Sequence, residues 1–334
     1  MAAQRHLLAR GERAPDFVLP DDQGRRARFY GFVGGGPSVL VLTGDGSATD
    51  PRPIVDALAE TVGRDVMHVV AGPGVEVGGS YLDSEGGLHG SYGVSPTEGP
   101  HVFVLDPNVR VAMVIGPGAP DLVADAARAA VAELAADQTP VAAPRHAPVL
   151  LIPDALAPSM RAELIERCEV HGTIETGVET SADGNRVEHT DVRHKRRRDH
   201  TVEDADLMRR LSTHVGRRVM PELSKAFAYR ATRFEGFKIG CYEEDSQGFF
   251  APHRDNLSPS TAHRRFAMSL NLNDDYDGGQ LRFPEYGPQL YRPEAGEALV
   301  FSGSHLHEVL PVTRGRRFVL LSFLFGEDAV GHKH

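Results

Sequence analysis

The feature that most constrains the fold of this 334-residue chain is a proline-rich break, because it separates two halves whose residue patterns differ. Residues 137–149 read DQTPVAAPRHAPV, with three prolines and little hydrophobic periodicity, which is typical of a linker. Before the break, strand-like and helix-like runs alternate; after it, helical patterns give way to many short strand-like runs. The length also suits two domains better than one. We therefore expect domains over 1–137 and 149–334, joined by a linker over 138–148.

The N-terminal half predicts an α/β domain. Its β-rich runs lie at 38–43, 65–72, 101–106 and 111–116. Helices are expected over 51–63 and 121–136, the second capped by Asp121. Strands separated by helices favour a mostly parallel sheet with helices on its faces.

The C-terminal half predicts an α+β domain in which helices precede a β structure. One helix should cover 158–172, and a capping box of Thr201 and Asp204 should open another. Pro221 should kink or split that second helix. Its core-facing stripe repeats every four residues: Leu207, Leu211, Val215, Val219, Leu223 and Phe227. From 234 to 325, short runs punctuated by Gly and Pro predict a sandwich or barrel.

Composition and charge narrow the function classes. The formal net charge of −10 disfavours nucleic acid and anionic membranes as partners. Two cysteines, Cys168 and Cys241, exclude a disulfide framework and a Cys-rich zinc site. No apolar run reaches the length of a signal peptide or of a membrane span of about 20 residues. We expect a cytoplasmic protein.

The segment GFFAPHRDN carries the strongest candidate for chemistry. His253 and Asp255 are two residues apart, so a strand would direct both to the same face. With a second histidine from elsewhere, they would make the two-His, one-carboxylate set that suits Fe(II) oxygenases, because it leaves coordination positions open. The pair alone is weak evidence in a chain with 16 histidines, and the alternative is a hydrogen-bonded surface pair.

Two later segments, GGQLRFPEYG and GEALVFSGSHLHEVLPVTRGRRFVLLSF, extend the pattern. With them, residues 242–325 resemble the catalytic core of the prolyl 4-hydroxylase-like group of Fe(II)/2-oxoglutarate-dependent oxygenases. The shared motifs, in order, are His253-Arg254-Asp255, Gly278-Gly279 with Phe283-Pro284, Pro293-Glu294-Ala295-Gly296, His307 with Pro311-Val312, and Arg317. The resemblance implies a double-stranded β-helix, or jelly roll. It also implies a dioxygenase that hydroxylates a C–H bond of a small molecule, amino acid or peptidyl substrate, releasing succinate and CO₂.

The resemblance also assigns catalytic roles. It implies that His253, Asp255 and His307 bind Fe(II), with His305 as the alternative distal ligand because it could share a strand face with His307. A basic residue should pair with the far carboxylate of 2-oxoglutarate, and the matching position is Arg317. Arg316 is the alternative, since neighbouring strand residues face opposite ways.

Two further residues are candidates for the cosubstrate site. The resemblance implies that Tyr242 hydrogen-bonds the same carboxylate, the alternative being core packing. Residues 266–273 alternate between large apolar and small or polar side chains, which could place Asn271 in the cavity. The implied cofactors are Fe(II), 2-oxoglutarate and O₂, with ascorbate as a further candidate.

A basic run, RHKRRRDH at 193–200, is conspicuous in an acidic chain. One interpretation is a solvated loop before a helix. The other is an edge of the substrate entrance that favours an anionic substrate. Nucleic acid is not favoured, because no aromatic residues are interleaved with the charges.

The N-terminal half resembles a peroxiredoxin, which has a thioredoxin-like fold. GERAPDFVLPDDQGRRARFYGF followed by SVLVL, and later GSYGV with GPHVFVLDPNVRVAMVIG, carry the resemblance over most of 8–137. The stretch GDGSATDPRP, where that family needs its cysteine, has none, and thiol peroxidase chemistry requires a thiolate. We expect a catalytically inactive domain with a structural role, which could be homodimer formation, substrate recruitment or covering the oxygenase entrance. For the whole chain, the alternative function is a non-catalytic sensor or scaffold with a vestigial metal site.

Overall fold

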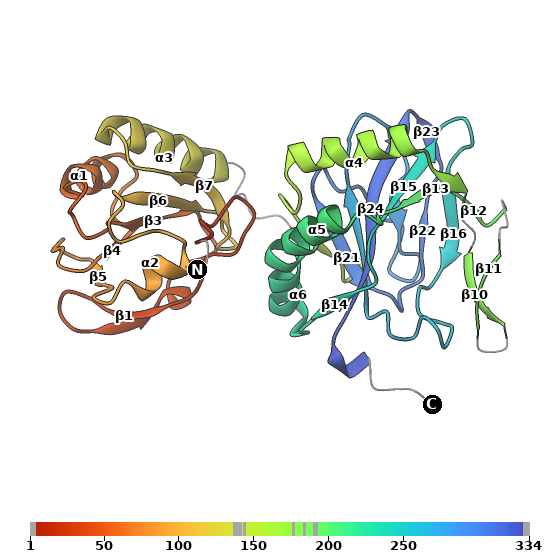
Figure 1. Ribbon diagram of the computed structural model, residues 1–334, viewed down its shortest axis with the longest axis horizontal. Coiled ribbons are helices and arrows are strands. Elements are labelled where there is room, and N and C mark those ends of the chain that lie inside the picture. The colour runs from red at the N-terminus through yellow and green to blue at the C-terminus, as the bar shows by residue number, and fades with distance from the viewer. Residues whose placement is uncertain are drawn as a thin grey trace. The chain divides into compact units, whose positions relative to one another are not determined.

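The computed structural model describes residues 5–135, 142, 145–175, 178–182, 185–189 and 193–329 (Figure 1). The chain divides into two compact units, Met1–Val141 and Ala142–His334. Of the predicted linker, positions 138–141, 143 and 144 lie outside the described residues. Among the helices of the described part, none combines the length and the apolar character needed to span a membrane.

The first unit is built on a five-stranded sheet of order β5-β4-β3-β6-β7. Its strands are β3 (Ser38–Leu42), β4 (Met67–Ala71), β5 (Tyr81–Leu82), β6 (His101–Leu105) and β7 (Val111–Ile115). The prediction of a mostly parallel sheet is wrong: β3-β4 and β4-β5 are parallel, whereas β3-β6 and β6-β7 are antiparallel. The short turn at Pro107 and Asn108 joins β6 and β7 as a hairpin, which forces antiparallel pairing.

Helices cover both faces of this sheet (Figure 1). They are α1 (Arg52–Thr61), α2 (Gly87–Ser91) and α3 (Pro120–Ala135). A hairpin of β1 (Val18–Pro20) and β2 (Arg26–Arg28), followed by the short turn η1 (Phe29–Gly31), completes the unit. Alternate residues of β3 serve two cores: Val39 packs with α1 and α3, and Leu40 packs with α2. Asp121 lies inside the first turn of α3, because the helix begins one residue earlier at Pro120, so the predicted cap is wrong.

The second unit consists of two antiparallel sheets that share a core. The larger sheet holds β8 (Leu150–Ile152), β21 (Ala298–Ser302), β17 (Phe266–Asn271), β24 (Arg316–Phe325), β15 (Lys238–Glu243), β13 (Arg198–Thr201) and β9 (Ile174–Glu175) in that order, with β14 (Arg233–Phe234) beside β24. The smaller sheet holds β12 (Lys195–Arg196), β16 (Phe249–His253), β22 (His307–Val309), β19 (Leu281–Arg282) and β20 (Leu290–Tyr291). Leu281 and Val309 of the smaller sheet pack with Leu299 and Val319 of the larger one.

Two short ribbons flank these sheets. They are β10 (Val178–Ala182) with β11 (Asn185–His189), and β18 (Asp277–Gly278) with β23 (Val312–Arg314), and the turn η2 (Glu327–Ala329) follows β24. The expected run of short strands is therefore present, and it forms two antiparallel layers that face each other across an apolar interior.

Helices α4 (Pro158–His171), α5 (Ala205–Arg218) and α6 (Met220–Phe227) pack on the larger sheet through a second core (Figure 1). The predicted stripe is confirmed: it is buried from Leu207 to Leu223, with Phe227 partly buried. The predicted split also holds, because Pro221 lies in the first turn of α6. The N-cap of α5 is Asp204, whose carboxylate accepts from the Leu207 N–H at 2.7 Å; Thr201 ends β13 instead.

A matched valine pair tests this helical core. Val215 on α5 is buried, whereas Val170 on α4 is 70% exposed. We expect Val215→Ala to lower the free energy of unfolding by about 2 kcal/mol, since it removes buried methyl groups and leaves a cavity. Val170→Ala should change it by less than about 0.5 kcal/mol. Urea unfolding of both variants checks this, and equal losses would contradict the assignment of the stripe to the core.

Candidate active site

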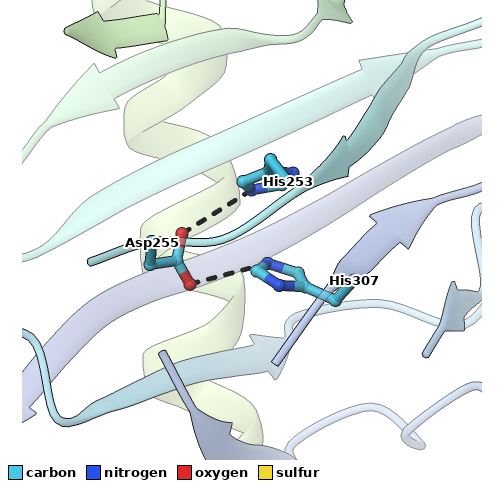
Figure 2. Close-up of side chains that lie close together, drawn as sticks. All are labelled: His253, Asp255 and His307. Carbon is cyan, nitrogen blue, oxygen red and sulfur yellow. Dashed lines mark ion pairs between the residues drawn. The ribbon is translucent and has the colours of Figure 1, made fainter. Parts of the chain in front are cut away.

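Two strands of the smaller sheet bring His253, Asp255 and His307 together (Figure 2). His253 ends β16 and pairs in register with His307, which begins β22, and Asp255 follows two residues after His253. One ligand atom from each residue lies within 4.8 Å of the others. The Asp255 carboxylate lies between the two rings, with Oδ1 3.6 Å from His253 Nε2 and Oδ2 3.5 Å from His307 Nε2.

The backbone fixes which nitrogen of each ring faces the carboxylate. Nδ1 of His253 lies 2.8 Å from the Ala251 carbonyl oxygen, and Nδ1 of His307 lies 3.0 Å from the His305 carbonyl oxygen. A carbonyl only accepts, so both Nδ1 atoms carry the proton, and in the neutral ring Nε2 offers a lone pair. Burial lowers the pKa of His307 to about 4, which keeps that ring neutral at pH 7. The Nε2 lone pairs of His253 and His307 are therefore both directed at the space beside the Asp255 carboxylate.

Asp255 contributes a buried anion. Burial by itself raises the pKa of this carboxyl, but His307 and His253 outweigh that effect and hold the pKa below its usual value. Its Oδ2 is buried and has no hydrogen-bond partner in the described part of the chain. A buried carboxylate oxygen without a donor is costly unless a cation meets it. The three side chains therefore fit a divalent metal ion, and two imidazoles with one carboxylate are the set that suits Fe(II).

A cavity of about 400 Å³ opens beside the three residues, which all line it. Tyr242 and Ser269 of the larger sheet and Leu281 and Val309 of the smaller sheet form part of its wall. The cavity therefore lies between the two sheets, with the metal-binding cluster on one side.

Arg317 is 1% exposed and is not among the described residues that line the cavity, but it contacts Ser269 and Tyr242, which do line it. Its Nε and Nη2 donate to Asn271 Oδ1 at 3.1 and 2.9 Å, and Nη2 also donates to Ser269 Oγ at 3.2 Å. These partners within the described ranges are uncharged, and a buried guanidinium with neutral partners favours the arrival of an anion. Arg316 differs: its side chain is 50% exposed and pairs with Glu169 at 2.6 Å. Of the two candidates, Arg317 faces the interior.

Tyr242 and Asn271 surround Arg317 in different ways. Tyr242 lines the cavity, and the Arg317 guanidinium carbon lies 5.5 Å from its ring centre. Asn271 is not among the described residues that line the cavity. Its Oδ1 accepts from Arg317, and its Nδ2 donates to Tyr276 Oη at 2.7 Å and to the Pro293 carbonyl at 2.6 Å. Asn271 thus holds Arg317 in place and does not itself reach the cavity.

His305, the alternative distal ligand, lies outside the cluster. Its ring packs against Tyr286 and Phe283, with centroids 5.1 and 6.3 Å away. The three-residue cluster found among the described residues contains His307 instead.

The sequence did not show which residues of the basic run at 193–200 face a cavity, but the structure does. Lys195 and Arg197 line the cavity, whereas Arg196 lies over the Phe249 ring on a different surface. The two-residue period of extended chain was the available signal, because it places 195 on β12 and 197 just after it on the same face.

Thiol chemistry has no support at either cysteine. Cys168 and Cys241 are buried, and burial raises the pKa of their thiols to about 11 and about 12. Only the thiolate reacts, so we expect both thiols to react with a disulfide reagent at pH 8 at least about a hundredfold more slowly in the folded protein than in urea. Absorbance of the released thiolate measures this, and a fast phase in the folded protein would contradict the burial.

Comparisons with known proteins agree with this geometry. Residues 237–325 match the family model of the 2OG-Fe(II) oxygenase superfamily. The chain is 36% identical over 101 residues to procollagen-lysine,2-oxoglutarate 5-dioxygenase 1 of Gallus gallus, covering 29% of this chain and 13% of that protein. It is 32% identical over 104 residues to a PKHD-type hydroxylase of Synechococcus sp. (strain JA-2-3B'a(2-13)), covering 29% of this chain and 46% of that protein. The chain thus spans less than half the length of either relative.

Solved structures similar to the chain share low identity with it. One is a prolyl hydroxylase in complex with a hypoxia inducible factor peptide fragment from Trichoplax adhaerens, with a TM-score of 0.44, 19% identity, and coverage of 55% of this chain and 87% of that one. Another is a prolyl-4-hydroxylase of Pseudomonas putida, with a TM-score of 0.39, 20% identity, and coverage of 54% and 94%. The family match, together with the His-Asp-His cluster, shows that the C-terminal region of this chain carries a 2OG-Fe(II) oxygenase domain.

Proposed function

We propose that this protein is an Fe(II)- and 2-oxoglutarate-dependent dioxygenase that hydroxylates a C–H bond of its substrate and releases succinate and CO₂. One observation carries the proposal: two imidazole lone pairs and a buried carboxylate oxygen without a donor converge beside a cavity. The family match over 237–325 supports it.

The side chains present have distinct tasks in this reaction. When bound, iron(II) with 2-oxoglutarate and O₂ supplies the two-electron oxidation of a C–H bond, coupled to decarboxylation of the cosubstrate. His253, Asp255 and His307, which all line the cavity, would hold the metal. Arg317 and Tyr242 would orient the far carboxylate of 2-oxoglutarate, Arg317 as the charge and Tyr242 as an O–H donor.

Apolar walls and a fixed network support these tasks. Phe301 and Val309 line the cavity and restrict water around the reacting groups. Asn271 fixes the Arg317 guanidinium, so that less freedom is lost when the carboxylate arrives.

A peptidyl substrate is proposed from the relatives. The relative from Gallus gallus is named for procollagen lysine, and residues 237–325, which match the family model, include the metal-binding cluster. The alternative substrate is a free amino acid or another small molecule.

The experiment is to incubate the full chain with Fe(II), 2-oxoglutarate and O₂ and to measure succinate by mass spectrometry. We expect slow succinate formation even without a substrate, abolished by a chelator and restored by added Fe(II). A chain that binds neither Fe(II) nor 2-oxoglutarate would support the alternative of a scaffold with a vestigial metal site.

For the N-terminal unit we propose a thioredoxin-like fold without thiol chemistry. Its mixed sheet, covered by α1 and α3 on one face and α2 on the other, supports the fold. Both cysteines of the chain come after this unit, which supports the absence of thiol chemistry. We also propose that this unit contributes to homodimer formation in the cytoplasm. Sedimentation of the full chain would give the mass of the assembly and so test whether it is a dimer.

A further inference from the structure

A carboxylate outside the metal-binding cluster connects the two segments that carry the candidate ligands. Glu285 lies in the turn after β19, and Arg254 lies between His253 and Asp255. The Arg254 guanidinium donates through Nη2 to Glu285 Oε1 at 2.6 Å and through Nη1 to Oε2 at 3.1 Å. This two-point contact fixes the residue that separates the first two ligands.

The same carboxylate also holds the segment of the third ligand. Leu306, which directly precedes His307, donates its backbone N–H to Glu285 Oε2 at 3.0 Å. Arg254 Nη1 additionally donates to the Ser304 carbonyl. Glu285 and Arg254 therefore bridge the end of β16 and the approach to β22, and this pair is called here the clasp.

One peptide group lies between the clasp and the His307 ring. The His305 carbonyl and the Leu306 N–H belong to the same planar group, so they turn together. The carbonyl accepts from His307 Nδ1 at 3.0 Å, and the N–H donates to Glu285. The carboxylate thus fixes the peptide group that sets the direction of the His307 ring, and with it the direction of Nε2.

The charge of Glu285 also acts through this peptide group. Hydrogen bonds in a chain polarise one another, so an N–H that donates to an anion makes the carbonyl of the same group a stronger acceptor. A stronger acceptor at Nδ1 makes the imidazole a better metal ligand through Nε2. Arg254 and the Leu306 N–H lower the pKa of Glu285 to about 2, so its carboxylate is charged at pH 7.

The exposure of the clasp separates this role from a role in folding. The side chains of Arg254 and Glu285 are 30% and 40% exposed, and ion pairs exposed to this degree contribute little to stability. By contrast, the outer hydrogen-bond partners of metal-binding side chains commonly change the metal affinity when they are removed. The clasp lies where the second effect applies.

We propose that Glu285 is a positioning residue for the metal site. Through the peptide group between residues 305 and 306 it orients His307 and strengthens Nε2 as a donor to the metal. Through Arg254 it holds the segment 253–255 against the segment of His307. The inference rests on the proposed function, because it takes the three-residue cluster as the Fe(II) site. It gives Glu285 no contact with the metal, the cosubstrate or the substrate.

Two variants of Glu285 test the clasp. Glu285→Gln removes the charge and keeps the size, whereas Glu285→Ala removes every contact of the side chain. The dissociation constant of Fe(II) is measured for the full chain by anaerobic calorimetry. We expect it to rise about tenfold in Glu285→Gln and further in Glu285→Ala.

Glu327→Gln is the matched control. Glu327 also makes a two-point ion pair, with Arg233 at 3.1 and 3.2 Å. It lies in the turn after β24 and is not among the described residues that line the cavity. The substitution removes the same charge, so the Fe(II) dissociation constant should change by less than about threefold.

Further measurements separate positioning from a general loss of structure. Thermal unfolding of the metal-free variants should stay close to that of the original chain. Hydrogen exchange of the Leu306 amide in the metal-free chain should be faster in Glu285→Ala, because its acceptor is gone. With Fe(II) and 2-oxoglutarate bound, the visible charge-transfer band should move to shorter wavelength in Glu285→Gln, since a weaker imidazole donor makes the iron a poorer electron donor.

Three results would overturn the proposal: an Fe(II) affinity of folded Glu285→Ala within about threefold of the original chain, an equal loss of affinity in Glu327→Gln, or an unmoved band in Glu285→Gln. If Glu285→Ala does not fold, the affinity of Glu285→Gln decides in its place. An original chain that binds no Fe(II) refutes the proposed function, whereas normal Fe(II) binding in both Glu285 variants refutes only the role of the clasp.

Discussion

Asp255→Ala is expected to abolish tight Fe(II) binding and to lower 2-oxoglutarate-dependent succinate formation by about a thousandfold or more. The reason is that Asp255 supplies the charge of the site and lies 3.5 and 3.6 Å from the two ring nitrogens that complete it. Without the carboxylate, two neutral imidazoles remain, and they cannot hold the ion in the same geometry. Calorimetric titration with Fe(II) under anaerobic conditions, followed by succinate measurement, checks this.

His305→Ala is the matched control for the metal-binding cluster. His305 lies two residues before His307 but outside the cluster, so its loss should leave Fe(II) affinity within about threefold of the original. If His305→Ala lost the metal and His307→Ala kept it, the distal ligand would be misassigned. Thermal unfolding of each variant separates loss of the metal from loss of the fold.

Arg317→Ala should raise the KM for 2-oxoglutarate by about a hundredfold. The buried guanidinium has uncharged partners, Asn271 and Ser269, and a carboxylate that reaches it in a dry site gains two charge-assisted hydrogen bonds. Arg317→Lys should recover part of the loss, because it keeps the charge but not the planar fork. Steady-state kinetics of succinate formation at varied 2-oxoglutarate measures both.

Arg316→Ala provides the comparison at the neighbouring position. That side chain is half exposed and pairs with Glu169, and exposed ion pairs contribute little, so the KM should change by less than about threefold. A hundredfold effect of Arg316→Ala with no effect of Arg317→Ala would reverse the assignment of the two arginines.

The local geometry of the cluster was predictable from the sequence because it depends on short-range rules. The strand period places His253 and Asp255 together, and the motif order selects His307 over His305, as the three-residue cluster in the structure has it. The same period distinguishes Arg316 from Arg317 once their strand is known. Pro221 likewise breaks its helix for a local reason, the missing N–H and the clash of its ring.

What the sequence could not supply depends on contacts between distant segments. Asn271 was expected in the cavity, yet tertiary hydrogen bonds to Arg317, Tyr276 and Pro293 use both ends of its amide. Lys195 on β12 and Lys238 on β15 line the same cavity, and no local pattern says that these two strands face it. The mixed sheet of the first unit escaped prediction for the same reason, since strand direction depends on how the chain crosses between strands.

The most direct test of the central claim is an anaerobic titration of the Fe(II)-loaded full chain with 2-oxoglutarate, followed by visible absorption. A 2-oxo acid that chelates Fe(II) gives a charge-transfer band in the visible range. We expect a band that saturates at one 2-oxoglutarate per chain, is absent in Asp255→Ala, and needs much higher 2-oxoglutarate in Arg317→Ala. A chain that binds Fe(II) but gives no band at any 2-oxoglutarate concentration would contradict it.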